Sequence, residues 1–132
     1  ARTMDRTVID WSRLEQLRAL QKPGRPDVVR QLVHTYLTNS ASLLDSLDEA
    51  LARDDHQVLV RAAHSLKSTT ATMGAEPLAA LAAELEQHFR AGRIEDAGTR
   101  IGQFRDHHAE VIRALRARYL QDPAPDSSRS AD

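Results

Sequence analysis

The segment from Ala63 to Ala75, AHSLKSTTATMGA, holds the residues of this sequence best suited to chemistry. The neutral imidazole of a histidine such as His64 is a nucleophile at physiological pH. Lys67 follows one helical turn later, where its ammonium group can lie beside an anion carried by the imidazole ring. Ser68 is small and leaves room for another protein to approach. This grouping indicates a group-transfer reaction that is completed with a partner molecule.

A helical wheel separates this group from the predicted core. At about 100° per residue, with His64 at zero, one set of residues falls within about 160–240°. That set, bordered by Ala63, forms the expected core face: Leu59, Ala62, Leu66, Thr70 and Met73. His64 lies almost opposite, among neighbours predicted to face solvent: Gln57, Val60, Arg61, Lys67, Ser68 and Ala71. We therefore expect His64 to be presented outward.

The remaining histidines are expected to be ordinary surface residues: His34, His56, His88, His107 and His108. Adjacent side chains on a helix point about 100° apart, so His107 and His108 would form a poor joint metal site. No HExxH or similar ligand spacing occurs in the sequence. We expect no metal and no cofactor in this domain.

The composition narrows the class of protein. The chain has 132 residues, a formal net charge of −1 and no cysteine. This length suits one domain, and the balanced charge argues against general nucleic-acid binding. No apolar run approaches the roughly 20 residues needed to span a bilayer, and the N-terminal segment lacks the apolar core of a secretory signal. We expect no direct membrane contact.

Helix-favouring residues dominate, and strand formers never alternate over a run, which predicts an all-α fold. Breaks at Lys22–Pro26, Gly74 and Gly92, together with a helix start at the acidic pair Asp54-Asp55, divide the chain into five helices. They are expected near residues 7–20, 27–53, 54–73, 76–91 and 94–120. Short connections favour an antiparallel up-down-up-down four-helix bundle with an additional short N-terminal helix. Residues 1–6 and the polar segment 121–132 are expected to be disordered. The first two helices are expected to bury these apolar residues: Ile9, Trp11, Leu14, Leu17 and Leu20, then Val28, Leu32, Val33, Tyr36, Leu37, Leu43, Leu44, Leu47 and Leu51.

Several of these residues together resemble the signature of histidine-containing phosphotransfer (HPt) domains. The matching positions are His64-Ser65-Leu66-Lys67-Ser68, Met73-Gly74-Ala75, Leu78 and Leu85-Glu86. The resemblance covers residues 7–120 and extends to the predicted layout of a short first helix and four longer ones. The position of Ser68 is often glycine in this family, and serine keeps it small.

The resemblance implies a function for each of these positions. His64 would accept a phosphoryl group from a phosphoaspartate of a response-regulator receiver domain and pass it to another receiver aspartate, with Mg²⁺ supplied by the receiver. Lys67 would neutralise the phosphoryl charge, Ser68 would give access, and Glu86 would lie near the histidine. Gln57, Val60, Arg61 and Ala71 would form the surrounding docking surface.

Two other functions stay open at this stage. One is a helical-bundle interaction module that docks a signalling protein without transfer, although the pairing of His64 with Lys67 favours transfer. The other is a metal- or cofactor-binding bundle, which requires inward-facing ligands on several helices. The sequence has no glycine-rich phosphate-binding loop, so we expect a phosphocarrier and not an autonomous kinase.

We also expect a monomeric, cytoplasmic domain. The sequence begins at Ala1 without Met, which favours the C-terminal module of a hybrid sensor histidine kinase over a standalone protein. In that setting the parent kinase would tether the domain to the inner membrane.

Overall fold

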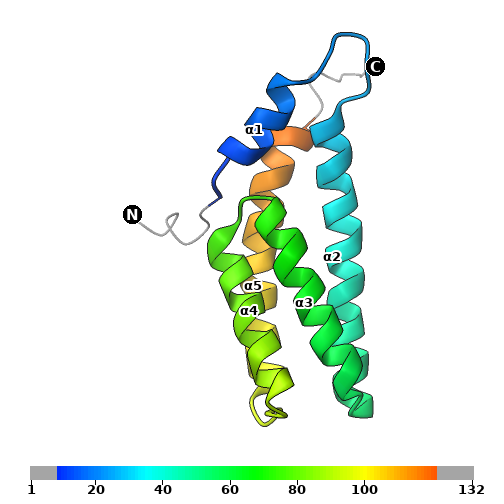
Figure 1. Cartoon of the computed structure of the whole chain (residues 1–132), viewed down its shortest axis with the longest axis vertical. Coiled ribbons are helices and arrows are strands. Elements are labelled where there is room, and N and C mark those ends of the chain that lie inside the picture. Colours follow the sequence, from blue (N-terminus) through cyan, green and yellow to red (C-terminus); the bar gives the residue numbers. More distant parts are fainter. Residues whose placement is uncertain (1–8, 122–132) are drawn as a thin grey trace, which may run out of the picture.

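A computed structural model of the chain describes residues 9–121, which contain helices and no strand. In chain order the elements are α1 (Ser12–Ala19), α2 (Val28–Arg53), α3 (His56–Thr72), α4 (Glu76–Arg90), α5 (Ala97–Leu115) and the π-helical turn η2 (Arg116–Leu120) (Figure 1). The predicted all-α class is confirmed. Disorder was predicted for residues 1–6 and 121–132, and all of these except Gln121 lie outside the described residues.

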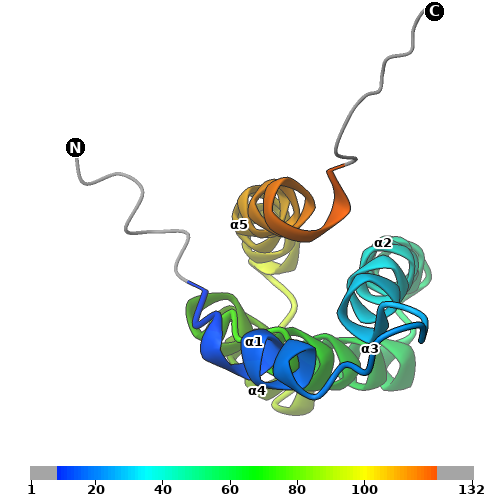
Figure 2. The ribbon, with the colours of Figure 1, turned by 90° about the horizontal axis from the view of Figure 1, so that it is seen from above.

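The four long helices form an antiparallel bundle (Figures 1 and 2). Helix α3 packs against α2 on one side and α4 on the other, and these are the most extensive contacts between elements. Helix α5 lies across from α3 and contacts α2 and α4. The short α1 crosses the end of the bundle where α3 ends and α4 begins (Figure 1). One face of α3 is thereby left open to solvent.

Local sequence signals fix the ends of the central helices. The side chains of Asp27 and Asp55 accept hydrogen bonds from the backbone N–H groups of Arg30 (3.0 Å) and Val58 (3.3 Å), which caps α2 and α3. Gly74 follows α3 with φ +85°, a conformation that glycine adopts without strain. The predicted bounds of α2, α3 and α4 therefore agree with the structure to within two residues.

The predictions for the first and fifth helices need correction. Helix α1 begins at Ser12 and not at residue 7, because the backbone N–H of Asp10 donates to the Gly74 carbonyl (2.8 Å) and its carboxylate accepts from Ser12 N–H (3.0 Å). These contacts hold Ile9 and Asp10 outside the helix. Helix α5 begins at Ala97, three residues later than expected, and changes to π-helical geometry after Leu115.

Three residues predicted to be buried are exposed instead: Leu17 (38%), Leu20 (75%) and Val28 (46%). Because α1 crosses the end of the bundle, Leu14 is buried in the core and the later residues of α1 extend beyond it. Val28 is the first residue of α2, and the next residue, Val29, is buried in its place.

The interior also contains polar contacts. The Tyr36 hydroxyl and Thr70 Oγ1 are 2.8 Å apart between α2 and α3, and burial raises the pKa of Tyr36 to about 12. His108 Nε2 lies 2.8 Å from the hydroxyl oxygen of buried Ser40, and its ring stacks on Phe104. The expectation that His108 is a solvated surface residue was wrong, because one turn after Phe104 it shares the face of α5 that packs on α2. Burial lowers its pKa, and so does the nearby charge of Arg105.

Candidate functional site

Helix α3 turns one face to the core and presents His64 on the other. The residues predicted for the core face are all buried: Leu59, Ala62, Ala63, Leu66, Thr70 and Met73. The His64 side chain is 54% exposed. Periodicity along α3 therefore placed this histidine correctly, and the imidazole is accessible to another molecule.

Glu86 of α4 lies beneath His64 in contact with it. Its Oε2 is 3.0 Å from His64 Nδ1, and its Oε1 is 2.8 Å from Lys67 Nζ. The Glu86 side chain is only 7% exposed. The packing of α3 on α4 brings Glu86 next to His64 and Lys67, which lie 22 and 19 residues earlier in the sequence, on the preceding helix. This is the position near the histidine that the family resemblance implied for Glu86.

Arg90 completes the group and was not singled out from the sequence. Its Nη2 and Nε lie 2.7 and 3.0 Å from Glu86 Oε2, so both donate to the same carboxylate oxygen. The available signal was the i, i+4 spacing of Glu86 and Arg90 on one helix, which pairs opposite charges. That spacing is common on surface helices and gave no hint of His64 nearby.

These partners keep Glu86 ionised. Hydrogen bonding from Lys67, with further contributions from Arg90 and His64, lowers the pKa of Glu86 to about 2 against the opposing effect of burial. A carboxylate that stays charged in the interior requires such compensation. At neutral pH the site thus holds a fixed negative charge directly behind the imidazole.

The fixed charge determines the hydrogen-bonding state of the ring. An ionised carboxylate has only acceptors, so His64 Nδ1 must carry the proton and donate it toward Glu86. In a neutral imidazole the other nitrogen, Nε2, then keeps its lone pair. This arrangement suits a nucleophile whose reactive atom is Nε2.

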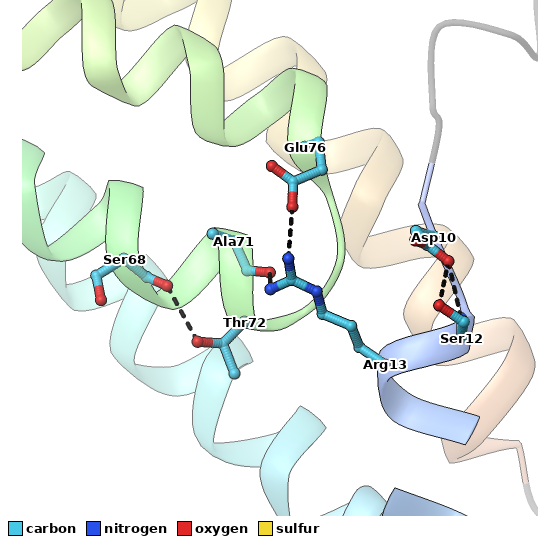
Figure 3. A network of polar contacts seen from close by, with 7 residues as sticks. All are labelled: Asp10, Ser12, Arg13, Ser68, Ala71, Thr72 and Glu76. Carbon is cyan, nitrogen blue, oxygen red and sulfur yellow. Dashed lines mark hydrogen bonds and ion pairs between the residues drawn. The ribbon is translucent and has the colours of Figure 1, made fainter. Parts of the chain in front are cut away.

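The other predicted docking residues fall into two places. Gln57, Val60 and Arg61 line an open hollow beside His64, together with His56 and Arg90. Ala71 lies near the end of α3, where its carbonyl accepts a hydrogen bond from Arg13 Nη1 (2.8 Å), as Figure 3 shows. Arg13 of α1 also pairs with Glu76 (3.1 Å). This part of the expected docking surface is therefore partly occupied by α1.

Ser68 is exposed next to Lys67, as the wheel predicted. Its backbone carbonyl accepts from Thr72 Oγ1 (3.1 Å), a contact within α3 that is visible in Figure 3. Over residues 9–121, no cluster of three or more His, Asp or Glu side chains could hold a metal ion. In the same part of the chain no helix is both long and apolar enough to cross a membrane.

Comparison with known proteins identifies this arrangement. The family model described as "Hpt domain" matches residues 31–114, which include His64, Lys67, Glu86 and Arg90. The chain belongs to the Hpt domain family. Function in this family is histidine phosphotransfer in two-component phosphorelays, in which Hpt proteins interact with receiver domains of response regulators. The chain is thus a phosphocarrier and not a conventional enzyme.

Two relatives support the same assignment. The chain is 26% identical over 102 residues to histidine-containing phosphotransfer protein 4 of Arabidopsis thaliana, an alignment that covers 76% of this chain and 80% of the relative. The crystal structure of histidine-containing phosphotransfer protein B (HptB) from Pseudomonas aeruginosa PAO1 is similar, with a TM-score of 0.77 and 30% sequence identity. That similarity covers 85% of this chain and 94% of HptB.

Proposed function

We propose that His64 is the residue of this Hpt domain that carries the phosphoryl group, and that Nε2 is the atom that binds phosphorus. The observation that supports this most directly is the 3.0 Å contact between His64 Nδ1 and Glu86 Oε2. Because Nδ1 is occupied by a proton shared with a carboxylate, only Nε2 offers a lone pair. A side chain that is 54% exposed can present that lone pair to a partner.

The proposed transfer is an in-line displacement at phosphorus. The Nε2 lone pair of His64 forms a bond to the phosphorus of a receiver phosphoaspartate, and the bond from phosphorus to the aspartate oxygen breaks. The bonding electrons leave with the aspartate carboxylate. The ring gains positive charge as the new bond forms, and the Glu86 carboxylate at Nδ1 stabilises it. The reverse steps pass the group to a second receiver aspartate.

Lys67 is the proposed cation for the transferred group. An ammonium group has three donors, and in this structure one contact reaches Glu86 Oε1 at 2.8 Å. The side chain is 38% exposed, so further donors can reach phosphoryl oxygens on Nε2. Ser68, small and exposed beside it, leaves room for the receiver loop that brings the aspartate.

The partner receiver is proposed to supply Mg²⁺, which neutralises charge on the phosphoryl oxygens during transfer. We further propose that the domain has no nucleotide site of its own and acts as a monomer in the cytoplasm. The lack of a glycine-rich phosphate-binding loop in the sequence supports the first of these proposals, that the domain has no nucleotide site. Its place in a hybrid sensor kinase, tethered by the parent to the inner membrane, remains our proposal.

Phosphoryl labelling of the full chain tests the assignment of His64. Incubation with a receiver domain phosphorylated on its aspartate, in the presence of Mg²⁺, is expected to give acid-labile, alkali-stable phosphate on the wild-type chain. His64→Gln should abolish the label, while His34→Gln, which alters an exposed histidine of α2, should keep it. Lys67→Ala should slow transfer by about 100-fold, the effect of losing one charged donor at the reacting group.

Label that persists in His64→Gln would refute the assignment of His64. Binding of the receiver without any label on the wild-type chain would instead support a docking module. Nitrogen NMR of the labelled chain identifies the substituted atom, and substitution at Nδ1 would contradict the proposed geometry.

A further inference from the structure

The surface around His64 differs on its two sides along α3. Toward the C-terminal end of the helix lie Ser68 and Ala71, which are small and uncharged. Toward the N-terminal end lies the open hollow that contains two guanidinium groups, those of Arg61 and Arg90. We call this second side the basic hollow, formed by His56, Gln57, Val60, Arg61, His64 and Arg90. A partner centred on His64 therefore meets two guanidinium groups toward the N-terminal end, in addition to the ammonium group of Lys67 one turn toward the C-terminal end.

The positively charged side chains near His64 differ in whether they already pair with a carboxylate. Lys67 and Arg90 each bond to Glu86, at 2.8 Å and 2.7 Å. Arg61 is exposed, and within residues 9–121 no carboxylate lies within ion-pairing distance of it. Glu86 already accepts from three side chains, and Asp55 accepts from the Val58 backbone N–H. Arg61 thus keeps its planar set of donors for an external acceptor.

The proposed partner, a receiver domain, presents carboxylate oxygens that can accept hydrogen bonds from the Arg61 guanidinium. A protein site that binds Mg²⁺ and an aspartyl phosphate must display carboxylate oxygens around the metal. When such a site approaches His64, its acidic rim comes within reach of side chains one turn away on α3. Arg61 is three residues before His64, which places it on the same side of the helix.

Building on the proposed phosphotransfer at His64, we propose that Arg61 is a specificity-determining residue that binds a carboxylate of the receiver in the basic hollow. It orients the partner so that the acidic rim lies over the hollow and the receiver backbone lies over Ser68. Charged groups at the rim of an interface act mainly on the rate of encounter and on the choice of partner. Arg61 is accordingly expected to act on encounter and not on the chemical step.

The test uses a receiver domain that labels the wild-type chain on His64. Transfer rates are measured against receiver concentration for the wild-type chain, Arg61→Ala, Arg61→Glu and the control Arg113→Ala. Arg113 is an exposed arginine of α5, so this control makes the same change in net charge on another helix.

We expect Arg61→Ala to lower the second-order rate constant by about 3- to 10-fold at low ionic strength, and Arg61→Glu to lower it further. The difference from Arg113→Ala should shrink as salt is raised, because exposed charges are screened over about 10 Å at 0.1 M. The rate at saturating receiver should stay within about 2-fold of wild type, since the chemical groups are intact.

A double-mutant cycle identifies the receiving carboxylate. Acidic residues near the receiver aspartate, other than those that bind Mg²⁺, are changed singly to amides, and one such change should remove the effect of Arg61→Ala. The proposal is overturned if Arg61→Ala matches Arg113→Ala at every salt concentration, or if it lowers only the saturating rate. Failure of the wild-type chain to label on His64 would overturn the proposed function itself, which is a separate result.

Discussion

Glu86 contacts three side chains at once, which makes it the centre of the site at the scale of single residues. Its Oε2 accepts hydrogen bonds from two nitrogens of Arg90 and from one nitrogen of His64, while its Oε1 accepts from Lys67. If Lys67 moves toward a phosphoryl group, Arg90 still holds the carboxylate. We therefore expect Arg90 to act as a positioning residue for His64, through Glu86.

Removing Arg90 tests this role. In Arg90→Ala, Oε2 loses two of its donors and the carboxylate can turn away from His64 Nδ1. We expect phosphotransfer to slow by about 10- to 100-fold, as is usual when the residue that orients a functional histidine is lost. Nitrogen NMR of the unphosphorylated chain should show a larger share of His64 with its proton on Nε2. Arg93→Ala, an exposed arginine that follows α4, is the control, and an unchanged proton position in Arg90→Ala would contradict the role.

At the scale of the elements, the end of α3 is joined to the N-terminal segment by close backbone contact. The Gly74 carbonyl accepts from the Asp10 N–H at 2.8 Å, and a Cβ at Gly74 would overlap the Asp10 carbonyl oxygen. Arg13 adds bonds to Ala71 and Glu76 (Figure 3). The family match begins at residue 31, so α1 lies outside it, yet α1 covers the turn from α3 to α4. That turn sets how α4 places Glu86 beside His64.

Alanine substitutions at Gly74 and Gly92 separate the cost of backbone strain from the cost of a steric overlap with Asp10. Both Gly74 and Gly92 have positive φ, +85° and +75°, but a Cβ at Gly92 meets nothing within 4 Å. We expect Gly92→Ala to reduce the free energy of unfolding by about 1 kcal/mol, the cost of the left-handed conformation. Gly74→Ala should cost about 2–4 kcal/mol, because the overlap with Asp10 adds to that strain. Denaturant unfolding measures both, and equal losses would show that the Asp10 contact contributes little.

At the scale of the whole molecule, the buried charge of the site makes stability depend on pH. The pKa of Glu86 is about 2 in the folded chain, against a usual value of 4.5. Between these values the unfolded chain binds more protons at this residue than the folded chain does. The stabilisation from ionised Glu86 is therefore fully present above about pH 4.5 and is lost as the pH falls toward 2.

This dependence can be assigned to Glu86 by substitution. Glu86→Gln should be less stable than the wild-type chain at pH 7, by about 1–3 kcal/mol, because Lys67 and Arg90 lose their charged acceptor. Its free energy of unfolding should also fall less steeply between pH 4.5 and 2. Glu84→Gln, at an exposed position of the same helix, is the control and should keep the wild-type slope. A wild-type slope in Glu86→Gln would show that other carboxylates cause the acid sensitivity.

The sequence by itself determined the features that depend on local periodicity and capping. Helical spacing placed His64 opposite the core residue Leu66, and the helix breaks with the acidic pair Asp54-Asp55 located the bounds of α2, α3 and α4 to within two residues. These signals are read within one helix, so no knowledge of neighbouring helices is needed. The motif around His64 then indicated the family.

Only the tertiary structure decided which side chains meet between helices. Periodicity gives the direction of a side chain but not the rotation and depth at which a second helix packs against it. Contacts of α3 with α4 brought the Glu86–Arg90 pair of α4 behind His64, and contacts of α2 with α5 placed His108 against Ser40. The crossing of α1 over the end of the bundle likewise left Leu20 exposed. The outward position of the histidine could be predicted from the sequence, whereas the charge network behind it depends on packing between helices.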